Sequence, residues 1–143
     1  MQLSAKTEYA LVALLELASI HASGQLLQVG HIAQRQGIPE RYLEQVLAAL
    51  RRAGLLHSSR GPRGGYRLNR PPADIHLDEV VNCLEGQPAR QRSGQRLSPE
   101  FGVLTGLDSR LLQARQRILS QTRLDQLLEE RQALCQPQPM FFI

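Results

Sequence analysis

The segment RGPRG at residues 60–64 constrains the fold most strongly, because it lies between two stretches with the composition of short strands. Glycine adopts backbone angles that other residues avoid and proline fixes its own, so this segment predicts a tight turn. Residues 55–59 and 65–68 can then pair as antiparallel strands. Pro71 soon follows and ends the second strand, because proline has no N–H to donate to a ladder. The sequence therefore predicts a basic β-hairpin.

Three amphipathic helices are expected before this hairpin. Apolar residues recur at helical spacing over residues 4–21, with Ser4 as the N-cap, over residues 27–36, and from residue 39 to about residue 53. Gly37 stops the second helix, so a tight turn joins it to the third. Two helices joined in this way form a helix-turn-helix, and a basic hairpin directly after it predicts a winged helix.

The length of 143 residues leaves room for one domain and an appended element. Residues 1–86, which end in a fourth helix, are expected to form the winged helix-turn-helix domain. Residues 87–102 are polar and rich in glycine, proline and arginine, which predicts a flexible loop. A long dimerisation helix and a short terminal helix are expected over 103–134, followed by a tail at 135–143. The fold class is therefore mainly α with a small β-hairpin wing.

The long helix after the loop has an apolar stripe that needs a partner. The stripe can bury against the winged-helix body as an intrachain cap, or against a second copy of the chain. We expect a homodimer, because two-fold symmetric proteins match two-fold symmetric DNA sites. The residues expected at the dimer interface are Leu104, Leu107, Leu111, Leu112 and Ile118.

Positive charge is concentrated in the first half of the chain. Residues 1–72 carry nine Lys/Arg and four Asp/Glu, whereas residues 73–143 carry eight and nine. Six arginines and no acidic residue fall within residues 51–70. A run of this kind is often only a solvated basic face, but the hairpin within it favours a polyanion such as DNA as the partner.

Several other classes of protein are excluded by the sequence. No apolar run reaches the ~18–20 residues of a membrane span, and the first residues lack the pattern of a signal peptide, so we expect a cytoplasmic protein. Cys83 and Cys135 are too far apart in sequence for a zinc ribbon or a disulfide scaffold. The sequence has no histidines at ligand spacing, no phosphate-binding loop and no nucleophile–base pair. Nothing in it therefore indicates an enzyme or a metal site.

Three stretches of the sequence resemble the Rrf-type family of bacterial winged-helix transcription regulators, which includes the IscR, NsrR and CymR types. They are LSAKTEYA at 3–10, IPERYLEQ at 38–45 and RGPRGGYRL at 60–68. The resemblance covers residues 1–86, and residues 103–130 match only in kind. It implies a dimeric regulator without catalytic activity, whose recognition helix enters the major groove of operator DNA while the wing reaches the minor groove.

The resemblance places the recognition helix at Glu40 to Leu50. Glutamine can grip adenine with two hydrogen bonds and glutamate can accept one from cytosine, so Glu44 and Gln45 are expected to read bases. Arginines at the two ends of the helix are expected to clamp phosphates. Polar residues on an exposed helix face are nevertheless ordinary, and tyrosine there is expected mainly to pack. The candidate DNA-binding residues of this region are Glu40, Arg41, Tyr42, Glu44, Gln45 and Arg51.

The wing supplies the other candidate DNA-binding residues. A narrow minor groove attracts guanidinium groups through its concentrated negative potential, which suits Arg60 and Arg63. The wing glycines are expected to let the backbone approach phosphates that a Cβ would hold away. The candidates are Arg60, Gly61, Pro62, Arg63, Gly64, Gly65 and Tyr66, the last expected mainly to pack.

The chain departs from many members of the family in the loop after the fourth helix. Those relatives carry three closely spaced cysteines there, which hold an iron–sulfur cluster, whereas residues 86–102 contain no cysteine or histidine. Because thiolates normally hold cluster iron, we expect no cofactor and a core position for Cys83. The loop arginines, Arg90, Arg92 and Arg96, suit an anionic ligand or partner, although a merely solvated loop is an equal alternative.

The expected function is that of a dimeric, sequence-specific regulator of transcription. We expect a repressor whose operator is an imperfect inverted repeat of double-stranded DNA. A small-molecule or protein effector, or cellular abundance alone, would set the fraction of operator sites that the protein occupies. The alternatives are a winged-helix protein-interaction module that no longer binds DNA, and a cluster-binding sensor with atypical ligands such as Cys83 or Glu8.

Overall fold

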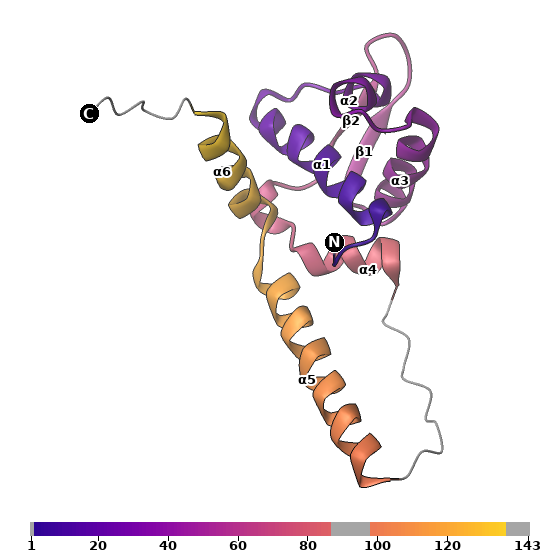
Figure 1. Cartoon of the computed structure of the whole chain (residues 1–143). Helices are drawn as coiled ribbons and strands as arrows, with labels where there is room; N and C mark the ends of the chain where they lie inside the picture. Colours follow the sequence, from indigo (N-terminus) through magenta and orange to yellow (C-terminus); the bar gives the residue numbers. More distant parts are fainter. Residues whose placement is uncertain (1, 87–97, 137–143) are drawn as a thin grey trace, which may run out of the picture.

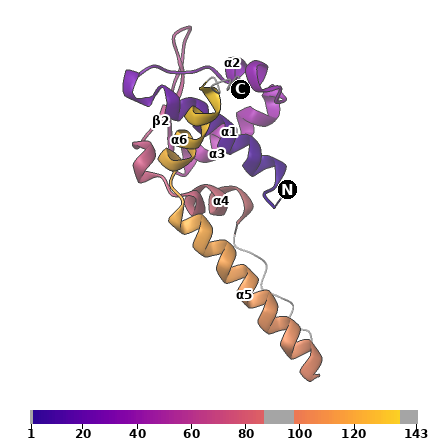
Figure 2. The ribbon, with the colours of Figure 1, turned by 60° about the vertical axis from the view of Figure 1, so that its left-hand side comes forward.

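A mainly helical domain with a two-stranded hairpin forms the head of the molecule, and a long helix leaves it as an arm (Figures 1 and 2). The computed structural model describes residues 2–86 and 98–136. The mainly α class with a β-hairpin wing is confirmed. The elements are α1 (Ala5–Ser19), the 3-10 helix η1 (His21–Ser23), α2 (Val29–Gln36), α3 (Glu40–Arg52), β1 (Leu56–Ser59), β2 (Gly65–Leu68), η2 (Pro72–Asp74), α4 (Leu77–Glu85), α5 (Pro99–Gln121) and α6 (Leu124–Cys135).

Helix α1 runs through the centre of the head and contacts α3, α4, α6 and β2. Ser4 caps it as predicted, because the Ser4 hydroxyl accepts a hydrogen bond from the backbone N–H of Thr7. Helices α2 and α3 form the helix-turn-helix. Gly37 ends α2 in the left-handed conformation with a φ of 67°, which glycine adopts without strain. The side chains of α3 that face the body are fully buried: Leu43, Val46, Leu47 and Leu50.

The hairpin is joined to the head by an isolated β-bridge. Strands β1 and β2 are antiparallel, in a register that runs from Leu56 opposite Leu68 to Ser59 opposite Gly65. Leu27, between η1 and α2, then pairs with Tyr66 through two backbone hydrogen bonds of 3.0 and 2.7 Å. This pairing fixes the base of the wing beside the start of α2.

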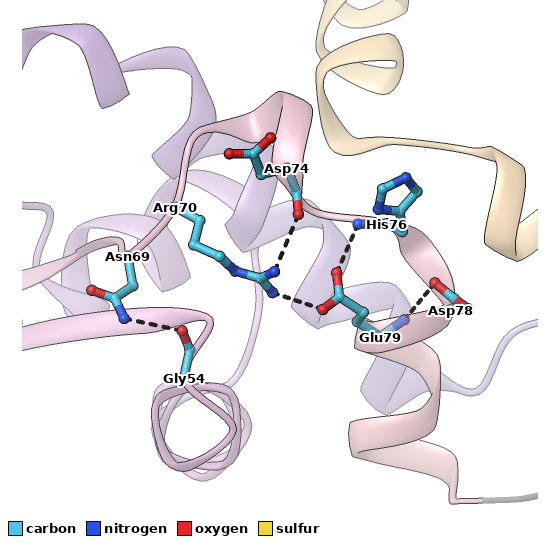
Figure 3. Close-up of polar contacts among 7 residues, drawn as sticks. All are labelled: Gly54, Asn69, Arg70, Asp74, His76, Asp78 and Glu79. Carbon is cyan, nitrogen blue, oxygen red and sulfur yellow. Dashed lines mark hydrogen bonds and ion pairs between the residues drawn. The ribbon is translucent and has the colours of Figure 1, made fainter.

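A polar cluster ties the end of β2 to the start of α4 (Figure 3). The Arg70 guanidinium pairs with Glu79 at 2.9 Å and donates to the Asp74 carbonyl at 3.2 Å. Partial burial opposes ionisation of Glu79, but the hydrogen bonds from the His76 backbone N–H and from Arg70 outweigh it and lower the pKa of Glu79. Arg70 therefore has a structural role, although it falls within the basic run at residues 51–70.

The arm begins earlier than the sequence analysis predicts. Residues 99–102, expected within the flexible loop, form the first turn of α5. The Ser98 hydroxyl accepts from the Phe101 N–H, and Pro99 occupies the first helical position, where its missing N–H costs nothing. The rest of the expected loop, with its three arginines, lies outside the described residues. So does the tail from residue 137 onward, whereas Cys135 ends α6.

The start of α4 anchors the C-terminal end of the arm to the head. There, the Leu77 N–H donates to the Thr122 carbonyl and the Leu124 N–H donates to the Ile75 carbonyl, both at 2.9 Å. Helix α6 then folds back along α1 (Figure 2). No helix within the described ranges has both the length and the apolar character needed to cross a membrane.

Candidate nucleic-acid interface

Helix α3 presents a polar face on the side away from the core. Arg41, Glu44 and Gln45 are exposed, and none of them forms a side-chain hydrogen bond or ion pair with the other described residues. Apolar residues at helical spacing hold the opposite face in the core, so these three side chains point outward. The predicted reading residues are therefore accessible to a partner.

Tyr42 is braced by α1. Its ring meets that of Tyr9 edge to face, with centroids 5.6 Å apart and an interplanar angle of 87°. About a third of Tyr42 (37%) stays exposed. This contact supports the packing role expected for Tyr42 and fixes the first turn of α3 against α1.

Glu40 lies closer to the head than its neighbours on α3. A Cβ added at Gly30, in the first turn of α2, would come within 3.2 Å of the Glu40 carboxylate. The side chain therefore lies against the N-terminal end of α2, where the helix dipole favours negative charge. No pattern in the sequence indicates that Gly30 leaves this space.

The wing arginines are available to a partner. Arg60 and Arg63 are exposed and form no hydrogen bond or ion pair within residues 2–86 and 98–136. Arg51, at the end of α3, donates to the Ser58 hydroxyl of β1 at 3.3 Å. The C-terminal end of the predicted recognition helix and the wing are therefore in direct contact, with uncompensated positive charge on both.

Two of the wing glycines are required by the hairpin itself. A Cβ at Gly64 would lie 2.2 Å from the Ser59 carbonyl oxygen, and one at Gly65 would lie 2.5 Å from the Leu27 carbonyl oxygen. Only Gly61, with a φ of 104°, has open space around it. The structure thus explains Gly64 and Gly65 by close approach of the chain to itself. Tyr66 is half-buried against the core, as expected for a packing residue.

The apolar residues of α5 divide into two faces. Leu104, Leu107, Leu111 and Ile118 are between 43% and 65% exposed. With Ala114 they recur at alternating intervals of three and four, which is the spacing of a two-helix seam. Leu112 is half-buried and shares its face with Arg115 and Leu119, where α5 packs on α4. The structure therefore separates Leu112 from the other four predicted interface residues.

Glu85, the last residue of α4, joins the arm to the start of α1. One carboxylate oxygen accepts from the Arg115 guanidinium at 3.3 Å, and the other accepts from the Ser4 N–H and hydroxyl at 3.3 and 3.2 Å. The hydrogen bond from the Thr7 side chain is the main cause that lowers the pKa of Glu85. This link is between residues 81 positions apart and has no local sequence signal.

Neither cysteine is part of a metal-binding group in the described parts of the chain. The Cys83 thiol is half-buried and donates to the Ala49 carbonyl of α3 at 3.6 Å, and Cys135 is exposed at the end of α6. Among residues 2–86 and 98–136, no three histidine, cysteine, aspartate or glutamate side chains are placed to hold a metal ion. Cys83 thus packs against the edge of the core, half-buried, where the sequence predicts a core position.

Comparisons with known proteins agree with this architecture. The family model described as "Rrf2: Iron-dependent Transcriptional regulator" matches residues 3–130. The chain is 36% identical to the HTH-type transcriptional regulator IscR of Cereibacter sphaeroides, over 99% of this chain and 96% of that protein. It is 39% identical to the putative HTH-type transcriptional regulator Rv1287 of Mycobacterium tuberculosis, over 87% of this chain and 79% of that protein.

Solved structures show the same fold. The structure of CymR, the global cysteine regulator of B. subtilis, superposes with a TM-score of 0.79 at 32% identity, covering 91% of this chain and 98% of that one. IscR of T. potens superposes with a TM-score of 0.79 at 31% identity, covering 96% and 93% of the two chains. The chain therefore belongs to the Rrf2 family of winged-helix DNA-binding transcription regulators, which are not enzymes.

Proposed function

We propose that this regulator is a cytoplasmic homodimer that represses transcription by binding an imperfect inverted repeat. Helix α3 enters the major groove and the wing enters the adjacent minor groove. The observation that carries this proposal is the exposed polar face of α3 beside a hairpin whose tip arginines have no partner among the described residues. Such side chains are available to DNA without first breaking an intramolecular contact.

Base reading is assigned to the middle of the α3 face and backbone binding to its ends. Glu44 and Gln45 have the hydrogen-bonding groups that distinguish cytosine and adenine in the major groove. Arg41 and Arg51 neutralise phosphates and so fix the register of the protein on the duplex. Arg60 and Arg63 occupy the minor groove, where guanidinium groups are attracted by its negative potential.

Two arginine variants should separate specific from non-specific binding. Arg60→Ala should cost about 1–3 kcal/mol of operator affinity, as expected for the loss of one good base contact. Arg51→Ala should weaken binding to all sequences alike and reduce the slope of log K against log salt by about one unit. Fluorescence anisotropy over a salt series measures both effects. Unchanged operator affinity in Arg60→Ala would reject the proposed wing contact.

The dimer is proposed to form through the exposed seam of α5. Four large apolar side chains on one face of an arm that stands away from the head are too many to leave in water. A second copy covers them by symmetry and also brings two α3 helices to the two halves of an inverted repeat. The opposite side of α5 stays packed on α4 of the same chain.

We propose that operator binding does not depend on an iron–sulfur cluster, although the family description refers to iron. The chain has only two cysteines, and the Cys83 thiol is engaged with the α3 backbone. The donor set therefore does not fit a cluster of the cysteine-loop type. An anionic small molecule or a protein partner is the proposed effector.

Anaerobic purification from iron-replete cells tests this point. We expect colourless protein with substoichiometric iron and sulfide and full operator affinity. Brown protein with stoichiometric iron and sulfide would contradict the proposal. In that case, loss of the colour in Cys83→Ala, with its retention in Cys135→Ala, would identify Cys83 as a ligand.

A further inference from the structure

The segment before α2 is the place where the wing meets the helix-turn-helix. Gln28 occupies the N-cap position of α2, but its side chain does not cap that helix. Its amide Nε2 instead donates a hydrogen bond of 3.1 Å to the Pro62 carbonyl at the tip of the wing, 34 residues away in sequence. This side chain therefore reaches from the helix-turn-helix to the hairpin tip.

Few other contacts hold the tip. Strand pairing ends at Ser59 and Gly65, and the turn between them contains one backbone hydrogen bond, from Gly64 to Gly61 at 2.9 Å. Among the described residues, the Gln28 amide is the one hydrogen-bonding group outside the hairpin that reaches residues 60–64. This contact is therefore the hydrogen bond through which the head can restrain the tip itself.

The same segment also contacts the start of α3. Gly30 leaves the space in which the Glu40 carboxylate lies, two residues after Gln28. Leu27, on the other side of Gln28, holds the base of the wing through its pairing with Tyr66. Residues 27–30 therefore contact both the wing and the N-terminal end of α3.

We propose that Gln28 is a positioning residue that holds the wing tip at the distance from α3 at which both enter one DNA duplex. The inference rests on the proposed function, in which the tip arginines bind the minor groove. Arg63 directly follows Pro62, so the Gln28 bond restrains the backbone of Arg63. A restrained tip loses less conformational freedom on binding than a free one, which strengthens binding without any contact between Gln28 and DNA.

The first part of the test needs no DNA. Gln28→Met keeps the length of the side chain and removes the donor. We expect exchange of the Gly64 amide, the hydrogen-bonded amide of the turn, to become several-fold faster, with exchange in α3 and the melting temperature unchanged. Gln36→Met is the matched control, because Gln36 is an exposed glutamine at the other end of α2 without a side-chain hydrogen bond to any described residue. Equal exchange in Gln28→Met and the wild type would overturn the proposal.

The second part of the test measures operator affinity in two backgrounds. In the wild-type background, Gln28→Met should weaken binding roughly three- to tenfold, as expected when one more segment must be ordered on binding. In an Arg60→Ala/Arg63→Ala background the same substitution should have no effect, because Gln28 acts through these arginines. Equal losses in both backgrounds would mean that Gln28 acts in another way and would overturn the proposal. If the wild type bound no DNA specifically, the proposed function would fail, whereas the hydrogen-exchange measurement would still decide whether Gln28 restrains the tip.

Discussion

The double substitution Leu107→Asp/Leu111→Asp is expected to give a folded monomer with operator binding weakened at least about a hundredfold. Both side chains are exposed on the seam of α5 and touch little of their own head. Two carboxylates from each protomer would have to be buried without partners in the dimer, at a cost that the seam cannot offset. Without the dimer, the two half-sites are no longer bound as one unit, which removes a gain of ~10²–10⁴ in affinity.

Sedimentation velocity and anisotropy measure the two consequences. Gln113→Asp is the matched control, because Gln113 is exposed on the polar side of the same helix, and it should remain a dimer with full affinity. Leu112→Asp should behave differently from the seam variant, because Leu112 is half-buried on the side that faces α4. A Leu107→Asp/Leu111→Asp protein that still sediments as a dimer would show that another surface forms the interface.

The second large effect is expected in the wing, from Gly64→Ala. The added Cβ would lie 2.2 Å from the Ser59 carbonyl oxygen and 2.8 Å from the Arg60 carbonyl carbon, so the backbone itself has to move. Because the turn cannot relax without losing the pairing between Ser59 and Gly65, we expect the free energy of unfolding to fall by about 2–4 kcal/mol. Operator affinity should fall with it.

Urea denaturation compares this variant with Gly102→Ala. Gly102 lies in α5, and an added Cβ would have no atom within 4 Å apart from the backbone of its own helix, so alanine there should stabilise the helix by up to about 1 kcal/mol. Opposite signs for the two substitutions would confirm that Gly64 is required by close approach of the backbone. A neutral Gly64→Ala would show that the turn relaxes without loss of pairing.

The head could be predicted from the sequence because local signals determine its elements. Apolar residues at helical spacing place α1, α2 and α3 to within a few residues, and Gly37 marks the turn between the last two. The composition of residues 60–64 indicates the hairpin, since glycine and proline between two strand-like stretches favour a tight turn. The exposed positions of α3 follow from the same spacing, because a helix buries one face and exposes the other, whereas their expected role in DNA binding comes from the resemblance to the family.

Contacts between residues distant in sequence could not be predicted in this way. Glu85 with Ser4 and Gln28 with Pro62 depend on the assembled head and leave no pattern in either segment. The start of α5 was missed for a different reason. Its first turn lacks apolar periodicity, although Ser98, Pro99 and Glu100 together form a recognisable N-terminal cap.

Selection of bound sequences from random duplex DNA, with the full chain at physiological salt, tests the central claim most directly. The account predicts enrichment of an imperfect inverted repeat whose half-sites lie about one helical turn, or a multiple of it, apart. This site should be bound at least ~10³-fold more tightly than random DNA, and Arg60→Ala should lose much of that preference. Equal affinity for all duplexes, with no enriched sequence, would contradict the account.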